Sequence, residues 1–222
     1  INVYMLIFYF PAPIILALLL NEVKHAMFKK FVQSISYLPH FLSTVVVCGM
    51  LVNFLSTDGL INQLIAFFGG KKIQFLMLPE WFRTIYVSSE IWQRIGWGSI
   101  VYLAALTGID PHLYEAARMD GANRWKQARH VTLPGIAPVI SILFLLTLGE
   151  IMSVGFEKIL LLYNGSTYET ADVISTYVYR RGLLGADFSY GTAVGMFQSV
   201  IALVLIFLAN QGARKAGAAS LW

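Results

Sequence analysis

Long apolar stretches alternate with shorter polar segments along this chain. Five of these stretches have about the length of the roughly 20 residues that an α-helix needs to cross the hydrocarbon core of a bilayer. Another apolar stretch, residues 60–68, has only nine residues, so we expect it to lie at the membrane interface or to pack on the bundle. The pattern predicts an all-α membrane protein whose helical bundle has five spans, at residues 3–20, 38–55, 85–106, 138–162 and 191–209.

The composition supports this class and excludes two others. Of the 222 residues, 57% are hydrophobic and 13% are charged, whereas a soluble domain has roughly 25% charged residues. The 15 Phe, 11 Tyr and 5 Trp exclude a disordered chain. Cys48 is the single cysteine and has no partner within the chain, which excludes a disulfide-rich secreted scaffold.

Lysine and arginine are unequally divided between the two sides of the predicted bundle. The side that contains the segments after the first and third spans holds nine of them, and the other side holds five. Because basic residues are enriched on the cytoplasmic side of membrane proteins, we predict that the N-terminus is outside and the C-terminus is cytoplasmic. The basic residues are not interleaved with exposed aromatic residues, so no nucleic-acid partner is expected. The nine are Lys24, Lys29, Lys30, Arg118, Arg124, Lys126, Arg129, Arg214 and Lys215, and the five are Lys71, Lys72, Arg83, Arg180 and Arg181.

The segment 110–135, between the third and fourth predicted spans, is unusually rich in charge. Its first 20 residues hold seven of the 28 charged residues in the chain. Asp110-Pro111 is typical of a helix start, because Asp caps the free N–H groups and Pro is tolerated in the first turn. Gly121 is typical of the residue that follows a helix. We therefore expect a helix-turn-helix on the cytoplasmic side, with Pro134 close to the start of the fourth span.

One face of the first predicted helix in this segment carries small side chains. Leu113, Ala116, Ala117 and Asp120 recur at helical spacing, so they share this face. The two alanines allow another surface to approach closely, and Glu115 supplies a carboxylate beside them. This pattern predicts a compact docking element.

The same residues resemble the EAA loop of permease subunits of binding-protein-dependent ABC importers. Glu115-Ala116-Ala117 is followed after three residues by Gly121, and after nine more by Val131 and then Leu133-Pro134. The family favours Ile at the place of Val131, a β-branched residue of similar shape. Residues 117–122 are similar to the sugar-uptake branch that includes the maltose permeases, and residues 21–51 and 155–183 look like permeases for larger saccharides. The resemblance extends over essentially the whole chain.

The resemblance implies a fold and a mechanism. Residues 1–222 would form a single transmembrane domain, and because the family has six or more spans, the first would precede Ile1. The segment 110–135 would be the coupling element, seated in a cleft of a cytoplasmic ATPase dimer. Glu115 would accept hydrogen bonds from basic groups, the alanines would permit close contact, and Gly121 would set the turn. The full set of coupling residues is Glu115, Ala116, Ala117, Asp120, Gly121, Leu133 and Pro134.

The implied function is transport of a saccharide, such as an oligosaccharide, across a bacterial plasma (inner) membrane by alternating access driven by ATP. The implied partners are the ATPase dimer, a second permease subunit, an extracytoplasmic solute-binding protein and membrane lipid. The sugar-family resemblance favours a different chain as the second permease, so that the pair would be a heterodimer. ATP and Mg would bind to the partner ATPase, and this chain would bind no cofactor.

No motif for catalysis or metal binding occurs in the sequence. Residues 69–72 read Gly-Gly-Lys-Lys and lack both the spacing and the hydroxyl residue of a phosphate-binding loop. The four histidines do not have the spacing of metal ligands. We therefore do not expect an enzyme.

Polar residues within the predicted spans are candidates for the substrate pathway, because a charge in the hydrocarbon core is costly. Glu150, in the fourth span, either lines the translocation cavity or forms a structural pair or a protonated carboxyl between helices. Asn53, Gln198 and Glu157 are further pathway candidates, and interhelical hydrogen bonding is the alternative for the two amides. Glu90 and Arg94 have the spacing of a local ion pair on one helix face.

Three other functions remain open at this point. An ABC permease for an amino acid, a peptide or phosphate would share the docking element. An ion-coupled secondary transporter would use charges within the membrane but usually contains inverted repeats, and it would leave the docking element unexplained. A purely structural membrane subunit would leave that element unexplained too.

Overall fold

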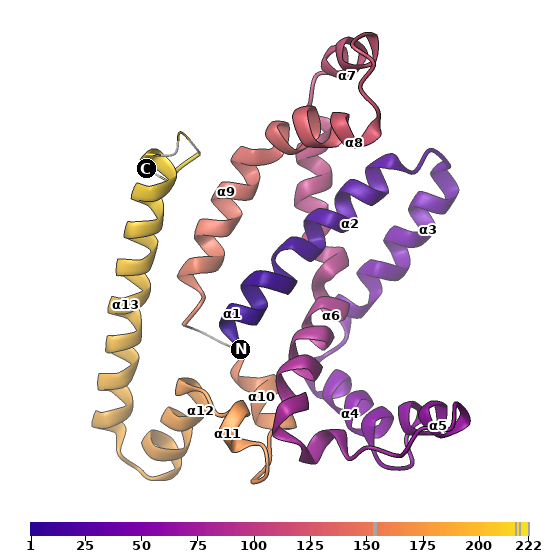
Figure 1. Cartoon of the computed structure of the whole chain (residues 1–222). Coiled ribbons are helices and arrows are strands. Elements are labelled where there is room, and N and C mark those ends of the chain that lie inside the picture. The colour runs from indigo at the N-terminus through magenta and orange to yellow at the C-terminus, as the bar shows by residue number, and fades with distance from the viewer. Residues whose placement is uncertain (153–154, 216, 218, 222) are drawn as a thin grey trace. The chain divides into compact units, whose positions relative to one another are not determined.

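A computed structural model describes residues 1–152, 155–215, 217 and 219–221. The described residues form helices joined by turns and short loops, without a β-strand. The chain folds as two compact units, each built from separated parts of the sequence. Figure 1 labels the helices and colours the chain by residue number. Unit 1 consists of Ile1–Tyr9, Leu38–Gln93 and Ser153–Gln198, and unit 2 consists of Phe10–Tyr37, Arg94–Met152 and Ser199–Trp222.

Helices of three kinds alternate along the chain. The α-helices are α1 (Asn2–Tyr4), α2 (Pro11–Glu22), α3 (Ala26–Tyr37), α4 (Thr44–Leu55), α5 (Leu60–Phe67), α6 (Pro79–Thr107), α7 (Pro111–Met119), α8 (Arg124–Gln127), α9 (Leu133–Gly149), α10 (Phe156–Leu162), α11 (Tyr168–Ala171), α12 (Ile174–Val178) and α13 (Phe188–Lys215). The π-helical segments are η1 (Met5–Tyr9), η4 (Ala128–Thr132) and η5 (Tyr179–Leu184), and the 3₁₀ segments are η2 (Leu38–Phe41) and η3 (Phe75–Met77).

Four helical segments among the described residues are long and apolar enough to cross a membrane. They overlap the first, second, fourth and fifth predicted spans. The third predicted span, 85–106, lies within α6, a helix of 29 residues whose polar side chains lower its hydropathy. The all-helical class is confirmed, whereas the number of five spans stays a prediction. The four segments are Asn2–Glu22, Thr44–Phe67, Arg124–Gly149 and Phe188–Lys215.

The predicted extent of the fourth span, 138–162, is wrong. The helix α9 begins earlier, at Leu133, and ends at Gly149, and a separate helix, α10, begins at Phe156. The amide of Glu150 closes the last turn of α9 by donating to the carbonyl oxygens of Leu146 and Thr147. A carboxylate next to a glycine, which has low helix propensity, ends the helix where apolar content alone had suggested that it continues.

The second predicted span, 38–55, also begins later than expected. Residues 38–41 form the 3₁₀ segment η2, which contains Pro39, and α4 begins only at Thr44. The hydroxyl of Ser43 caps α4 by accepting a hydrogen bond from the amide of Val46. Pro39 within η2 and the capping Ser43 therefore separate η2 from α4.

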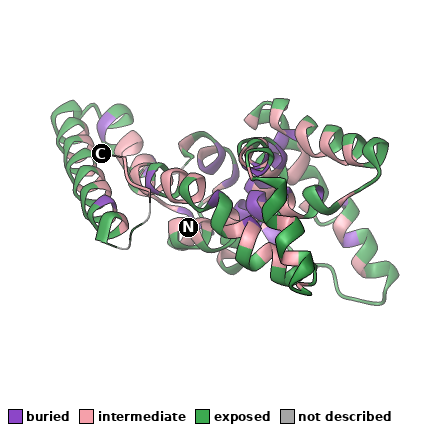
Figure 2. Ribbon diagram, turned by 90° about the horizontal axis from the view of Figure 1, so that it is seen from above, coloured by how far each residue is buried: buried purple, intermediate pink, exposed green. Residues whose placement is uncertain are grey.

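Each unit has its own cluster of buried apolar residues. In unit 1, Phe82 and Tyr86 of α6 pack with Ile159 of α10 and with Cys48 of α4. In unit 2, side chains from α2, α6 and α9 meet around Ile136, which is fully buried. Most other helix surfaces in this single chain are exposed, above all along α13 (Figure 2). Such surfaces suit a chain whose neighbours are lipid or other subunits.

We predict that Gly96→Ala destabilises unit 2. A Cβ atom at Gly96 of α6 would overlap the backbone carbonyl of Ser36 at the end of α3, so the two helices would have to separate. Overpacking of this kind costs about 1–3 kcal/mol. The expected result is a lower midpoint in thermal unfolding of the detergent-purified protein.

Gly49→Ala is the matched control. Gly49 also lies within a helix, α4, but nothing lies within 4 Å of the position of its Cβ. Alanine there should leave the midpoint unchanged or raise it, because it favours the helix over the unfolded chain. Equal midpoints for the two variants would contradict close packing at Gly96.

Candidate functional site

The predicted docking helix is α7, and both of its ends are capped as the sequence suggested. At its start, Oδ1 of Asp110 accepts a hydrogen bond of 2.9 Å from the amide of His112. At its end, the amide of Ala122 donates to the carbonyl of Ala117 at 2.9 Å, and the amide of Gly121 donates to that of Arg118 at 3.0 Å. This is a Schellman motif, which requires the left-handed conformation that Gly121 adopts with φ 73°.

No residue of α7 is buried, and the helix projects beyond α8 (Figure 1). Glu115 and Ala116 are exposed, Ala117 is half-buried, and Asp120 is exposed at the C-cap. Met119 is exposed over 89% of its surface, which is unusual for a large apolar side chain unless another surface covers it. The geometry is therefore that of a helix available for docking.

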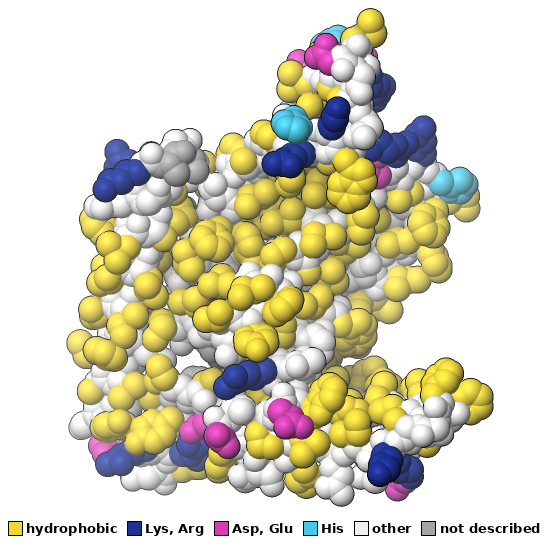
Figure 3. Space-filling model, viewed as in Figure 1, with side chains coloured by type: hydrophobic (Ala, Val, Ile, Leu, Met, Phe, Trp, Pro, Cys, Tyr) yellow, Lys and Arg dark blue, Asp and Glu magenta, His cyan; other side chains and the backbone are white. Residues whose placement is uncertain are grey.

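The carboxylate of Glu115 contacts a residue on its own helix. Its Oε2 lies 3.2 Å from Nδ1 of His112, one turn earlier, and both side chains are largely exposed. The contact leaves the carboxylate open to basic groups of another protein. Lys and Arg side chains gather around α7, α8 and the end of α2, next to apolar helix surfaces (Figure 3).

The helix α7 is connected to α9 through a short and well-bonded segment. The hydroxyl of Tyr114 lies 3.1 Å from that of Thr132, the last residue of η4, which leads directly into α9. The side chain of Gln127 donates to the carbonyl of Ala122 at 2.7 Å and so fixes the turn between α7 and α8. These bonds tie α7 and the turn after it to η4 and α8.

The remaining two predicted coupling residues lie at the start of α9. Leu133 is half-buried and packs against the cluster around Ile136, whereas Pro134 is exposed in the first turn. They lie beyond the connection that follows α7, and their role in coupling stays a prediction. A proline in the first turn supports a helix start, because its missing N–H would have had no partner there.

An ion pair joins α8 to the end of α2. The guanidinium of Arg124 lies 2.6 Å from the carboxylate of Glu22, with both side chains about half exposed. Sequence spacing gives no signal for this pair, because its members are 102 residues apart.

The four pathway candidates lie in separate local surroundings. Glu150 is exposed at the C-cap of α9 in unit 2, and it does not stand in the middle of a helix as its place in the predicted span suggested. Glu157 is exposed in the first turn of α10, and Gln198 is half-buried in α13. Asn53 is exposed, and its amide nitrogen donates to the carbonyl of Gly49 on the same helix at 3.0 Å. A role in substrate passage stays a prediction for all four.

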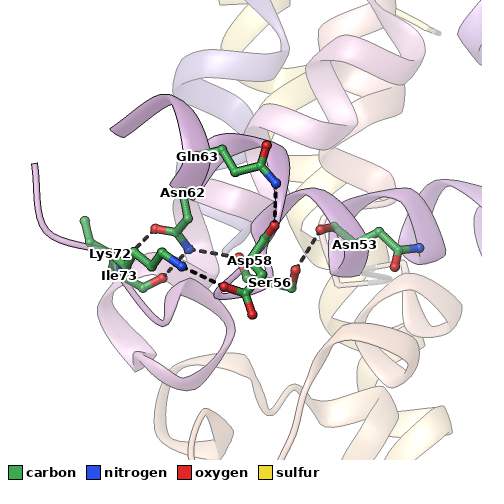
Figure 4. A network of polar contacts seen from close by, with 7 residues as sticks. All are labelled: Asn53, Ser56, Asp58, Asn62, Gln63, Lys72 and Ile73. Atoms are coloured by element: carbon green, nitrogen blue, oxygen red, sulfur yellow. Dashed lines mark hydrogen bonds and ion pairs between the residues drawn. The ribbon is translucent and has the colours of Figure 1, made fainter. Parts of the chain in front are cut away.

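Beyond Asn53, the loop after α4 is held in shape by one fully buried amide (Figure 4). Asn62 donates to the carbonyls of Ser56 and Ile73 at 2.9 and 2.8 Å, and it accepts from the amide of Ile73 at 2.8 Å. Nearby, the ammonium of Lys72 lies 2.6 Å from the carboxylate of Asp58. The short apolar stretch predicted at 60–68 is thus α5, and Asn62 in its first turn bonds to segments on both sides of it in the chain.

A buried ion pair in unit 1 is the main feature that sequence reasoning missed. Lys158 of α10 is 2% exposed, and its ammonium lies 2.6 Å from the carboxylate of Glu90 of α6. It also donates to Oε1 of Gln93 at 2.9 Å, and it lies 3.4 Å from the hydroxyl of Ser89. The sequence shows both Glu90 and Lys158 within apolar stretches, where a charge needs a partner. Because they are 68 positions apart, the sequence does not indicate that they form a pair.

A second ion pair braces the segment between α11 and η5. Nη1 and Nη2 of Arg180 donate to the carboxylate of Asp172, at 2.9 and 2.6 Å, and the hydroxyl of Thr176 donates to it at 2.6 Å. These hydrogen bonds, that of Arg180 foremost, hold the pKa of Asp172 below its usual value.

Comparison with known proteins identifies the family of this chain. Residues 9–214 match the family described as binding-protein-dependent transport system inner membrane component. The chain belongs to this family. The match confirms the resemblance that the residues of α7 and of the connection to α9 suggested.

Members of the binding-protein-dependent transport family that resemble the chain include two proteins of Bacillus subtilis (strain 168). The polygalacturonan/rhamnogalacturonan transport system permease protein YteP is 52% identical over 210 residues, which are 94% of this chain and 65% of that protein. Protein LplB is 46% identical over 211 residues, which are 95% of this chain and 66% of that protein. The chain therefore spans slightly less than two thirds of the length of these relatives.

A solved structure of the family has the same fold. The crystal structure of a bacterial alginate ABC transporter in complex with alginate pentasaccharide-bound periplasmic protein contains a chain that superposes with a TM-score of 0.97. The two chains are 50% identical, and the match covers 99% of this chain and 77% of that one.

We predict that Lys158→Met destabilises unit 1 strongly. Removal of one partner leaves the carboxylate of Glu90 buried without its counter-charge, at a cost of about 3–5 kcal/mol. In the double variant Glu90→Gln/Lys158→Met no charge is left, so part of the stability should return. Thermal unfolding of the wild type, the two single variants and the double variant, compared in a double-mutant cycle, measures how much stability returns.

Lys72→Gln is the control for the buried pair. It removes an ion pair of the same length, 2.6 Å, from an exposed site, where solvent screens the charges. A drop in the unfolding midpoint for Lys72→Gln as large as for Lys158→Met would contradict the importance of burial.

The Asp172–Arg180 pair predicts a dependence of stability on pH. Because the pKa of Asp172 is lowered in the folded protein, the pair stabilises the fold above the unfolded pKa of about 3.9, and this contribution is lost as the pH falls through the folded pKa. In Arg180→Gln, the free energy of unfolding should fall less than in the wild type as the pH drops below about 4. Unfolding midpoints between pH 6 and pH 3 test this, with Glu169→Gln, an exposed carboxyl nearby, as the control.

Proposed function

We propose that the chain is the permease subunit of an ATP-driven importer that moves a saccharide, such as an oligosaccharide, across the bacterial plasma membrane. The observation that carries the proposal is the exposed helix α7, which has a small-residue face and is joined through α8 and η4 to α9, in a member of this transport family. The relatives' names, which include polygalacturonan/rhamnogalacturonan transport and alginate transport, favour a sugar over an amino acid, a peptide or phosphate.

In this proposal α7 docks into a cleft of a cytoplasmic ATPase subunit. Ala116 and Ala117 permit close approach, and Glu115 accepts hydrogen bonds from basic groups in the cleft. Asp120 and Gly121 end the helix and turn the chain toward α8. ATP and Mg bind to the ATPase, and this chain contributes the mechanical connection.

Closure of the ATPase dimer would move α7, and the bonds of Tyr114 and Gln127 would pass the movement to α9. The helices of this chain and of a second permease subunit, which we infer to be a different chain, would then open the pathway to the outside. A solute-binding protein would deliver the saccharide there, and hydrolysis would reset the bundle. The periplasmic protein in the alginate transporter structure supports the inclusion of such a partner.

The proposal also fixes the orientation. With α7 on the ATPase side, the C-terminus of α13 and the turn between α2 and α3 are cytoplasmic, in agreement with the excess of lysine and arginine. With five spans, as the sequence predicts, the segment between the fourth and fifth predicted spans is on the outer side of the membrane.

The test of the function is purification of the full-length protein from its native membrane, followed by reconstitution in liposomes. We expect an ATPase with a phosphate-binding loop to co-purify, and ATP-dependent uptake of oligosaccharides when a solute-binding protein is supplied. Co-purification of the ATPase with uptake of amino acids, peptides or phosphate would contradict the sugar assignment only. Uptake driven by an ion gradient without any ATPase would overturn the proposal.

We predict that Glu115→Lys abolishes uptake while the protein still inserts into the membrane. The substitution places a positive charge where the cleft is expected to present basic groups, so the ATPase should no longer co-purify. Glu169→Lys makes the same change at an exposed residue of the outer loop and should retain the ATPase. Loss of the ATPase in both variants, or in neither, would contradict the role of Glu115.

We predict a similar loss of uptake for Gly121→Val but a milder one for Gly121→Asn. Valine in the left-handed conformation costs roughly 1–2 kcal/mol or more, whereas asparagine adopts it more readily. Rates of uptake for the two variants at matched protein levels measure this difference. Equal rates would show that the turn does not matter for coupling.

A further inference from the structure

A polar cavity lies behind α7, on the side of the helix that faces its own unit. Its volume is about 540 Å³, and its charged lining residues are Glu22, Lys24, Arg118 and Arg124. Tyr114 lines it as well, one turn before Arg118. Residues four apart lie on one face of a helix, and Ala116, midway between them, lies on the opposite face. The cavity is therefore separate from the small-residue face proposed for the ATPase.

The lining of this cavity has an excess of positive charge. Glu22 is the one carboxylate among the lining residues, and it is paired with Arg124 at 2.6 Å. The ammonium of Lys24 and the guanidinium of Arg118 add two further positive charges to the same cavity. An anion with several acceptor oxygens, such as a phosphate group, would complement this arrangement.

A second, apolar cavity adjoins the first. Its volume is about 250 Å³, and it shares Asn21, Glu22 and Arg124 with the polar cavity. Its other lining residues include Leu18 and Leu19, one turn further into the first candidate span, so it lies deeper toward the hydrocarbon region.

Trp125 lines the apolar cavity, and 85% of its surface is exposed in the single chain. Tryptophan at such a boundary is typical of the zone where lipid headgroups meet acyl chains. The two cavities together thus offer a charged compartment and an apolar one, joined at the level of a membrane surface.

We propose that these cavities bind one anionic phospholipid of the inner leaflet, with its phosphate at Lys24 and Arg118 and the start of its acyl chains along Leu18 and Trp125. A free anion would fill only the polar cavity. A carboxylate of the ATPase would have to reach around α7, because Tyr114 bonds to Thr132 on this side. An anionic lipid fills both cavities at once, because its phosphate suits the polar cavity and its acyl chains suit the apolar one.

The experiment measures lipid binding to the full-length protein, with the subunits that co-purify, after delipidation in detergent. Native mass spectrometry quantifies bound phosphatidylglycerol, phosphatidylcholine with the same acyl chains, and glycerol 3-phosphate as the headgroup without chains. We expect the wild type to prefer phosphatidylglycerol. Lys24→Gln and Arg118→Gln should each weaken its binding about fivefold, and Trp125→Ala should weaken it without removing the preference for the anionic lipid.

Arg129→Gln and Lys126→Gln are the matched controls, because they remove nearby exposed charges that do not line either cavity. They should leave the affinity for phosphatidylglycerol unchanged. Equal binding of the two lipids, an equal loss in the controls, or glycerol 3-phosphate binding as tightly as the whole lipid would each overturn the proposal. Unfolding midpoints of all variants show whether a loss of binding is due to a loss of fold.

Discussion

A hydrocarbon environment offers no water to hydrogen-bond with the backbone or with polar side chains, and this constraint governs the structure. The backbone forms its hydrogen bonds within helices, and buried polar side chains form theirs with one another or with backbone carbonyl groups. No buried side-chain nitrogen or oxygen among the described residues is without a hydrogen-bond partner. Gln93 illustrates the rule, because it accepts from Lys158 at 2.9 Å and donates to the carbonyl of Leu42 at 3.1 Å.

The break between α9 and α10 follows from the same constraint. A continuous helix from 138 to 162 would carry Glu150, Glu157 and Lys158 along one span, each in need of a partner. The break leaves Glu150 at a helix end and lets α10 bring Lys158 to Glu90 of α6. Buried ion pairs contribute little net stability compared with apolar packing. The pair is therefore better understood as fixing which face of α10 packs on α6.

Much of the fold and part of the candidate site could be predicted from the sequence. The apolar stretches predicted the helical class, and Asp110 and Gly121 predicted both ends of α7, because caps depend on neighbours within four residues. The Lys158–Glu90 pair and the Arg124–Glu22 pair could not be predicted in this way. They depend on contacts between residues far apart in the sequence, about which periodicity and local propensity carry no information.

If α7 docks as proposed, its two faces have different requirements, and this difference would explain its composition. A face that docks into another protein needs small side chains and an accessible charge, which Ala116 and the neighbouring Glu115 would provide. The opposite face must keep the helix in a fixed relation to α9, which Tyr114 does through its hydroxyl. If an anionic lipid occupies the space beside Arg118, it stiffens this inner face without touching the docking face. Coupling would then depend on the membrane as well as on the ATPase, because the same short helix is held between them.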